Sequence, residues 1–410
     1  MNIIIINHYA GSPKYGMEYR HFYLAKEWTE LGHKVCIVAA SFSHLRNMEP
    51  VVSGSASTET VDGVQYIWLK TPPYKGNGIA RVINMLSFGL EIVMYTKKIM
   101  SFCDPDLVIA SSPHPFIIFG ANRLARLSDA KLLFEVRDLW PLTLTELNRI
   151  PERHPFIAMM QKCENFAYKV SDRVISLLPK ADTYMRDHGL KREKFSYIPN
   201  GINISEWQYA GRNICPHRTI LTQLKNEAKF IVGYAGSHGL ANDLDTLIDA
   251  ATLMQSEPVA FVLVGSGPEK KRLVNVSEQR GLSNINFLNS ISKSAIPELL
   301  SLMDVLYIGW KNDPLYRFGI SPNKIMDYMM AGKPVIHAVS APNDMVAESG
   351  CGLTIQPENP NAAAGAIIRL MNMTETERKS MGLNGKNYVA ANHDYKILAK
   401  RYLESINCIS

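Results

Sequence analysis

The sequence predicts an α/β protein with two similar domains, each built from a parallel sheet with helices on both faces. Two observations support this fold class. Short apolar runs alternate with helical patterns along the chain, and this alternation begins twice, near residues 3 and 230. Strands that alternate with helices are typical of parallel sheets. The length of 410 residues is also sufficient for two or three domains.

In the first half, a buried strand at Ile3–Ile6 precedes a helix at Arg20–Leu31, which Gly32 ends. The next strand is expected at Val35–Ala39. Further apolar runs predict strands at Gln65–Leu69, Leu107–Ala110, Leu132–Val136 and Val174–Leu177.

The second half restarts with a strand at Phe230–Tyr234, after a connecting segment near Pro199–Trp207. It continues with strands at Phe261–Val264, Ile285–Leu288, Val305–Ile308 and Val335–His337. Folds of this kind bind ligands at the carboxyl ends of their strands. If the two domains face each other, they would form a cleft for two substrates.

Composition and net charge indicate an ordinary globular protein and argue against nucleic-acid binding. With 46% hydrophobic and 20% charged residues, the chain can build ordinary globular cores. The net charge of +6 is too mild and too scattered to indicate nucleic-acid binding. Most of the basic excess falls in residues 1–200, which fits either anionic lipid headgroups or a solvated surface.

The cysteines and the start of the chain bear on the compartment. Six cysteines lie far apart without a C-x-x-C pair, which argues against a zinc site and fits reduced thiols in a cytoplasm. The chain opens directly on a strand, so no signal peptide is expected.

The most informative stretch is SPNKIMDYMMAGKPVI, residues 321–336, which predicts a turn, one helix and the start of a strand. Pro322 suits the first turn of that helix. Asn323 and Lys324 then lie at the helix N-terminus, and Asp327 lies one turn further along. Free N–H groups, the helix dipole and an ammonium favour a phosphate, and the carboxylate could accept hydrogen bonds from a ribose diol. The alternative is a capped helix without a ligand.

This string resembles the nucleotide-sugar site of the GT-B glycosyltransferases, specifically the retaining enzymes of family 4. Members typically carry two glutamates before Ala, Gly and Pro-Val; the second falls on Asp327 and the first on Gly319, where a carboxylate is absent. The variant with Asn323-Lys324 resembles a subgroup that makes bacterial surface polysaccharides from amino-sugar donors, including the N-acetyl-L-fucosamine transferases of the WbuB type. The resemblance covers nearly the whole chain.

The GT-B resemblance implies a particular division of the chain. Residues 1–200 would form an acceptor-side Rossmann-like domain, and residues 201–389 a Rossmann-like domain that binds the nucleotide sugar. Residues 390–410, with a helix near Tyr395–Glu404, would pack back onto the first domain.

Two motifs of the first domain carry candidate residues. In GSPKYGMEYR, the resemblance assigns Gly16 to the donor diphosphate. It assigns Met17, Glu18 and Arg20 to the acceptor.

FEVRDLWP has Arg137-Asp138 where family members often have His-Asp beside the sugar. Arg137 could neutralise a phosphate or orient a sugar, and Asp138 could hold a sugar hydroxyl. A structural Arg–Asp pair is the alternative.

The motif YAGSHGLANDLDTLI departs from the family pattern at two places. The usual Arg and Lys on the diphosphate are replaced by Ser237 and Asn242. The positive charge must therefore come from elsewhere, first from Lys324, then from Arg317 or Arg137.

The remaining donor-binding candidates lie in loops after strands of the second domain. His238 could supply a hydrogen bond, and its place between two glycines predicts that it is accessible to solvent. By resemblance, the loops beside the nucleotide contain Gly236, Ser237, Gly265 and Gly267, and uracil lies near Ser290-Ile291.

One apolar segment could meet a membrane. From Val82 to Thr96 the only charge is Glu91, and Lys97-Lys98 follow. This run is shorter than the ~20 residues of a spanning helix, but it could form an interfacial helix with flanking cations. A buried core helix is the alternative; the lipid-linked acceptor expected for the family favours the interface.

The resemblance implies a retaining glycosyltransferase with Arg137, Asp138 and Lys324 as its catalytic residues. It would move an N-acetylated deoxyamino sugar, with L-FucNAc favoured, from a UDP-sugar to an undecaprenyl-diphosphate-linked saccharide in O-antigen or capsule biosynthesis. Such an enzyme would lie on the cytoplasmic face of the plasma membrane. No cofactor is expected, although a metal could replace the missing Arg and Lys.

Two other functions remain open from the sequence. A non-hydrolysing UDP-sugar 2-epimerase has the same fold, acts on one substrate and needs no lipid acceptor. A non-catalytic scaffold of a polysaccharide assembly complex would release no UDP with any acceptor.

Overall fold

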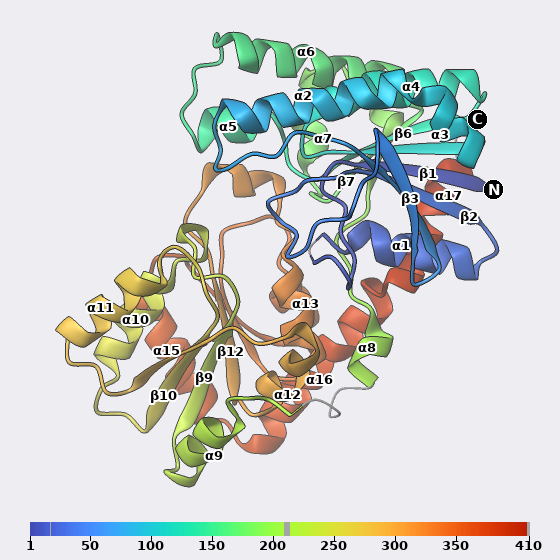
Figure 1. The fold of residues 1–410 in the computed structure, drawn as a ribbon. Helices are drawn as coiled ribbons and strands as arrows, with labels where there is room; N and C mark the ends of the chain where they lie inside the picture. The colour runs from blue at the N-terminus through green and yellow to red at the C-terminus, as the bar shows by residue number, and fades with distance from the viewer. Residues whose placement is uncertain (17, 209–213, 408–410) are drawn as a thin grey trace. The chain divides into compact units, whose positions relative to one another are not determined.

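The computed structural model describes residues 1–16, 18–208 and 214–407 (Figure 1). They divide into two compact units. The first unit contains Met1–Asn200 together with the chain from Tyr395, and the second contains Gly201–Asp394. Each unit is an α/β structure with a single sheet, as the sequence predicts.

The sheet of the first unit has the strand order β3-β4-β2-β1-β5-β6-β7-β8. Its strands are β1 (Asn2–Asn7), β2 (Lys34–Ala40), β3 (Ala56–Val61), β4 (Val64–Leu69), β5 (Leu107–Ser111), β6 (Lys131–Val136), β7 (Arg173–Ser176) and β8 (Phe195–Tyr197). Residues Ile3–Ile6 of β1 are fully buried, which explains their continuous apolar run. Neighbouring strands are parallel except for β3, which pairs antiparallel with β4.

Helices cover both faces of this sheet (Figure 1). The helices of the unit are α1 (Arg20–Glu30), α2 (Ile79–Met94), α3 (Thr96–Phe102), α4 (Ile118–Leu127), α5 (Leu142–Glu146), α6 (Pro155–Val170), α7 (Ala181–Asp187) and α17 (Tyr395–Asn407). On one face, α17 packs against α1: Trp28 Nε1 donates to the carbonyl of Ala399 at 2.9 Å, and the Tyr402 ring meets the Trp28 ring. Helix α17 therefore completes the core of the first unit.

The sheet of the second unit has the order β11-β10-β9-β12-β13-β14, with all strands parallel. The strands are β9 (Phe230–Ala235), β10 (Val259–Val264), β11 (Ile285–Leu288), β12 (Val305–Gly309), β13 (Val335–Ala338) and β14 (Gly352–Ile355). The strand order reverses between β9 and β12, as in doubly wound nucleotide-binding folds.

Nine helices of the second unit lie within the described residues. They are α8 (Ile204–Gln208), α9 (Arg218–Asn226), α10 (Leu244–Leu253), α11 (Lys270–Gln279), α12 (Ile296–Ser301), α13 (Asn323–Met330), α14 (Met345–Ser349), α15 (Pro360–Met371) and α16 (Glu375–Asn392). Helices α10 and α15 contact each other, and so do α13 and α16. The loops that follow β9 and β10 carry the glycine motifs of the sequence, and the loop after β11 carries Ser290 and Ile291.

No single helix among the described residues is long and apolar enough to cross a membrane. The bent pair α2 and α3 has the required length and composition, with a 67° break between its helices.

Helix α2 is apolar on two opposite faces. Its inner face buries Asn84, Met85, Phe88, Gly89 and Ile92. Its outer face exposes Ile79, Ile83, Leu86, Leu90 and Met94. The predicted interfacial segment therefore contains both core and exposed apolar residues.

Candidate active site

The loops after β9, β10 and β11 meet around a cavity of about 350 Å³ in the second unit. The residues that line it are Ala235, Gly236, Ser237, Val264, Gly265, Ser266, Gly267, Ser290, Ile291 and Ile296. The three loops that the sequence assigns to the nucleotide after β9, β10 and β11 all contribute to this lining. The structure therefore brings together Gly236, Ser237, Gly265, Gly267, Ser290 and Ile291.

Two glycines allow these loops to pack closely. A Cβ atom on Gly265 would lie 1.9 Å from the Gly236 carbonyl oxygen, and one on Gly267 would lie 2.5 Å from the His238 carbonyl oxygen. Both glycines also have positive φ angles, +150° and +157°, which side chains rarely adopt. Any larger residue would force the two loops apart and open the cavity wall.

Lys324 places an ammonium beside this cavity. Its Nζ donates to Tyr234 Oη at 2.9 Å and to Asn242 Oδ1. A Cβ atom on Gly236 would lie 3.4 Å from the same Nζ, so the ammonium borders a lining loop. Burial lowers the pKa of Lys324 to about 7. An anion in the cavity would favour the protonated form and raise this pKa again.

Lys324 contacts one of the two positions where the family pattern has a basic residue. The sequence has Asn242 where the family pattern has a lysine. In the structure, Asn242 does not supply charge but holds the ammonium of Lys324 in place. The cation thus reaches the cavity from α13 rather than from the loop after β9.

The start of α13 differs slightly from the prediction. The helix begins at Asn323, so Pro322 is its N-cap residue and precedes the first turn. Asn323 is exposed, and Asp327 is half-buried one turn along. Burial raises the pKa of Asp327 to about 6. The positive charge of Lys293 and a hydrogen bond from Trp207 act in the opposite direction and limit this rise. Above that pH, Asp327 is an ionised hydrogen-bond acceptor.

The prediction that His238 is accessible to solvent is wrong. Its side chain is fully buried, because the loop after β10 closes over it at Gly267. Neither ring nitrogen has a hydrogen-bond partner among the described residues. Burial and the nearby Lys270 and Lys324 lower the pKa of His238 to about 4. The neutral ring keeps one donor and one acceptor for a ligand.

Lys270 is a further cation near the cavity that the sequence reasoning missed. Its Nζ donates to the carbonyls of Gly265 at 2.9 Å and Leu288 at 2.7 Å, and to Asn289 Oδ1 at 3.3 Å. It therefore joins the loops after β10 and β11. Its position directly after the glycine loop GSGPE could have indicated from the sequence that Lys270 lies near the cavity.

Arg317 does not line the cavity. Its side chain is exposed, its Nη1 donates to the Pro314 carbonyl at 2.7 Å, and its guanidinium lies 4.3 Å from the Phe318 ring centroid. Lys324 is consequently the better placed of the two cations from this segment.

In the first unit, Arg137 and Asp138 directly follow β6. The side chain of Arg137 forms an ion pair with the side chain of Glu18. The backbone N–H of Arg137 donates to Ser112 Oγ at 2.9 Å. Burial raises the pKa of Asp138, which Arg137 opposes.

The other predicted residues of this region have different positions. Arg20 is buried, and its guanidinium donates to Glu135 at 3.0 Å and to the carbonyls of Ile198 and Pro199. It stabilises the interior of the first unit rather than facing a ligand. Gly16 has φ +98° and packs against Asn47. Met17 lies outside the described residues.

The sequence reasoning also missed two histidines at the carboxyl ends of β1 and β5. His8 Nδ1 and His114 Nε2 are 2.7 Å apart, and both rings are buried. Burial lowers the pKa of both, that of His114 to about 3. The strand order of the first sheet reverses between these strands, which is where such folds bind ligands. Each histidine follows a predicted strand within four residues, and this position in the sequence could have indicated them.

No group of three or more His, Cys, Asp or Glu side chains in the described part of the chain could hold a metal ion.

Solved structures of similar shape establish the fold. Sucrose-phosphate synthase from Thermosynechococcus elongatus matches with a TM-score of 0.74 at 18% identity, covering 98% of this chain and 97% of that one. Anabaena HepE, solved in complex with UDP and glucose, matches with a TM-score of 0.66 at 17% identity, covering 99% of both chains.

Two family models match the sequence. The model described as Glycosyltransferase Family 4 matches residues 15–206, and the model described as Glycosyl transferases group 1 matches residues 220–388. This chain is a glycosyltransferase of the GT-B fold. The glycosyltransferase is also 25% identical over 316 residues to WcaI of Escherichia coli K12, a candidate colanic acid biosynthesis glycosyl transferase; the match covers 75% of this chain and 76% of the relative.

The geometry of the glycosyltransferase defines what its second unit can do. The cavity combines glycine-rich loops, whose backbone can approach a ligand closely, with the side chain of Lys324. Because the pKa of Lys324 is lowered to about 7, this amine is about half protonated near neutral pH. These features suit a ligand with a diphosphate group. The half-buried carboxylate of Asp327 adds an acceptor on the same helix as Lys324.

Proposed function

We propose that this glycosyltransferase transfers a sugar from a UDP-sugar to a lipid-linked saccharide, with retention of configuration, in the biosynthesis of a bacterial surface polysaccharide. The main observation is the ammonium of Lys324 beside a cavity that is formed by the three donor loops. The complex of Anabaena HepE with UDP supports uridine as the nucleotide. The name of WcaI supports a role in polysaccharide biosynthesis.

The proposed reaction breaks the bond between the sugar C1 and the diphosphate oxygen and forms the new glycosidic bond on the same face. The acceptor hydroxyl gives its proton to the departing phosphate. Negative charge then grows on the diphosphate, where Lys324 and the free N–H groups of α13 stabilise it. Asp327 accepts hydrogen bonds from the ribose diol, and backbone groups near Ser290 and Ile291 bind uracil.

We propose L-FucNAc as the donor sugar and an undecaprenyl-diphosphate-linked saccharide as the acceptor. The Asn323-Lys324 and Arg137-Asp138 pairs support this choice, because both resemble the amino-sugar subgroup. In this proposal, Arg137 and Asp138 contact sugar hydroxyls, and Glu18 fixes the guanidinium of Arg137. No metal ion is required, because Lys324 and the α13 N-terminus supply the positive charge. The enzyme works at the cytoplasmic face of the plasma membrane.

Replacing Asp327 by Ala should weaken UDP binding about tenfold or more. Loss of a charged hydrogen-bond partner typically costs ~1.5–3 kcal/mol. Calorimetry with UDP measures the change. Asp249→Ala is the matched control, because this aspartate lies in the same unit, its side chain is 42% exposed, and it pairs with the surface residue Arg280. An unchanged UDP affinity in a folded Asp327→Ala protein would exclude the ribose assignment.

UDP affinity should fall with rising pH, by up to tenfold per pH unit above pH ~7. The reason is that the unliganded enzyme loses the proton of Lys324 near pH 7, whereas a bound diphosphate requires the ammonium. UDP itself is fully ionised above its second phosphate pKa of ~6. Calorimetry between pH 7 and 9 measures this slope. The same slope in Lys324→Met would show that another group titrates.

We further propose that the outer face of α2 contacts the membrane surface. Ile79 is 79% exposed and Ile83 is 53% exposed, and Lys97-Lys98 follow the helix. Apolar side chains flanked by cations are typical of interfacial helices.

Replacing Ile79 and Ile83 together by Ser should lower binding to anionic liposomes and leave the melting temperature nearly unchanged. Phe88→Ala is the contrasting variant. Its ring is fully buried, so its loss should destabilise the protein by ~3–5 kcal/mol. Flotation and melting curves separate the two effects. Full liposome binding by the double variant would place any membrane contact elsewhere.

A further inference from the structure

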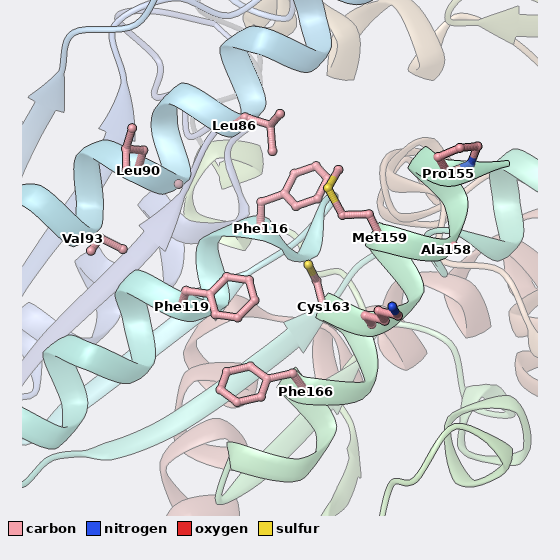
Figure 2. Close-up of a pocket in the computed structure, with 12 residues that line it drawn as sticks. Leu86, Leu90, Val93, Phe116, Phe119, Pro155, Ala158, Met159, Cys163 and Phe166 are labelled. Carbon is pink, nitrogen blue, oxygen red and sulfur yellow. The ribbon is translucent and has the colours of Figure 1, made fainter.

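The first unit contains a second, larger cavity of about 760 Å³ between α2, α4 and α6 (Figure 2). Leu86, Leu90 and Val93 of α2 form one wall, and Met159 and Phe166 of α6 form the other. We call this cavity the helical groove. Its volume lies within the range of small-molecule sites.

The floor of the helical groove is aromatic. Phe116 and Phe119 lie between the two walls, as Figure 2 shows. Phe119 remains 47% exposed although it stacks on Phe166, with 5.1 Å between ring centroids. Large apolar side chains exposed together in a hollow indicate a binding surface.

Close helix packing forms the groove in advance of any ligand. A Cβ atom on Gly89 of α2 would lie 3.0 Å from the Phe116 carbonyl oxygen. One on Gly120 of α4 would lie 2.5 Å from Cγ2 of Ile92. These two glycines therefore allow α2 to pack closely against the floor of the groove and against α4.

The surrounding helices are strongly basic. On α2, α3, α4 and α6 the basic residues are Arg81, Lys97, Lys98, Arg123, Arg126, Lys162 and Lys169. The acidic residues of the same helices are Glu91 and the buried Glu164. Burial raises the pKa of both carboxyl groups. An apolar groove that is lined by Lys162 and formed by basic helices is complementary to a hydrocarbon chain that carries an anionic headgroup.

The groove chemistry distinguishes a hydrocarbon chain from a peptide. Apart from Lys162, the side chains that line it are apolar or a thiol. A bound peptide would leave its N–H and C=O groups without partners, at a cost of several kcal/mol. A hydrocarbon chain has no such groups and gains from every apolar contact.

We propose that the helical groove binds the isoprenoid chain of the lipid-linked acceptor. This inference rests on the proposed function, because it names the part of that acceptor which the first unit holds. Lys162, which lines the groove, would then be the nearest cation for the diphosphate at the end of the chain.

The test measures binding of isoprenoid diphosphates of two lengths to the full-length protein. Calorimetry compares geranylgeranyl diphosphate with geranyl diphosphate below their aggregation limits, and inorganic pyrophosphate reports the headgroup alone. Wild type should bind the longer chain at least tenfold more tightly than the shorter one, because each additional buried methylene strengthens binding.

Phe119→Ser and Met159→Ser change the floor and one wall of the groove. Each should lower the affinity for geranylgeranyl diphosphate about fivefold or more. Both residues are partly exposed, so the fold should persist. Leu127→Ser is the matched control, because Leu127 is 52% exposed on α4 but does not line the groove. It should bind like wild type.

Several results would overturn the inference. Equal affinity of wild type for both chain lengths would exclude a chain site, and an equal loss in Leu127→Ser would indicate unspecific partition. A concentration-dependent mass that Phe119→Ser abolishes would assign the groove to a second copy of the chain. UDP binding, measured in parallel, distinguishes failure of the proposed function from failure of the groove assignment. If only UDP binding is absent, the proposed function is wrong. If only the chain-length effect is absent, the groove assignment is wrong.

Discussion

Replacing Lys324 by Met should lower the turnover of the donor about 100-fold or more, while uridine binding changes little. The ammonium gains most as charge develops on the departing diphosphate, and loss of one such group typically costs 10²–10³ in rate. The structure holds this ammonium between Tyr234 and Asn242, beside the loop of Gly236. UDP release, with the UDP-sugar that binds best, measures turnover.

Lys271→Met is the matched control for this prediction, because Lys271 is an exposed lysine of the same unit. It should keep wild-type turnover. Turnover that persists with a chelator would support charge neutralisation by protein groups. Wild-type turnover of Lys324→Met at saturating donor would contradict the role of Lys324 and point to Arg317 or Arg137.

Replacing Glu135 by Gln should destabilise the first unit by ~3–5 kcal/mol. This carboxylate is fully buried and accepts hydrogen bonds from Arg20 at 3.0 Å, His21 at 2.8 Å and Ser111 at 2.9 Å. The Gln variant leaves the buried guanidinium of Arg20 without its counter-charge, which is the costly way to break a buried pair. Tyr402 of α17 also donates to Glu135, so the helix should loosen too.

Urea unfolding at pH 7 measures this loss of stability. Glu375→Gln removes an exposed pair with Lys379 and should change stability little. Because pairing lowers the pKa of Glu135, its stabilising effect should be present above its ordinary value of 4.5 and lost at more acidic pH. A loss of stability no greater than that of the control would show that Glu135 is dispensable.

Most of the fold could be predicted because buried parallel strands are continuous apolar runs. Each predicted strand forms at its place in the two sheets. Strands β3, β8 and β14 were missed. Strand β3 was missed because an edge strand with the sequence ASTETV is mostly polar. Its signal was the turn Asp62-Gly63, where both residues have positive φ angles, as two-residue hairpins require.

The candidate site could also be predicted only in part, where its structure depends on the local sequence. The glycine loops could be predicted, since a close approach of backbone is imposed locally by glycine. The burial of His238 could not be predicted, because it depends on the loop after β10, which lies far along the sequence. For the same reason, the sequence did not show that Arg137 pairs with Glu18, or that Arg20 turns inward to Glu135.

The central claim is that the cavity of the second unit binds a uridine diphosphate. Calorimetry of the wild-type protein with UDP, GDP and dTDP tests it most directly. The account predicts that UDP binds at least tenfold more tightly than either competitor. GDP presents a different base edge to the loop at Ser290 and Ile291, and dTDP lacks the 2′-hydroxyl that Asp327 would hold. Binding of GDP or dTDP as tight as that of UDP, or no binding of any of the three, would contradict the claim.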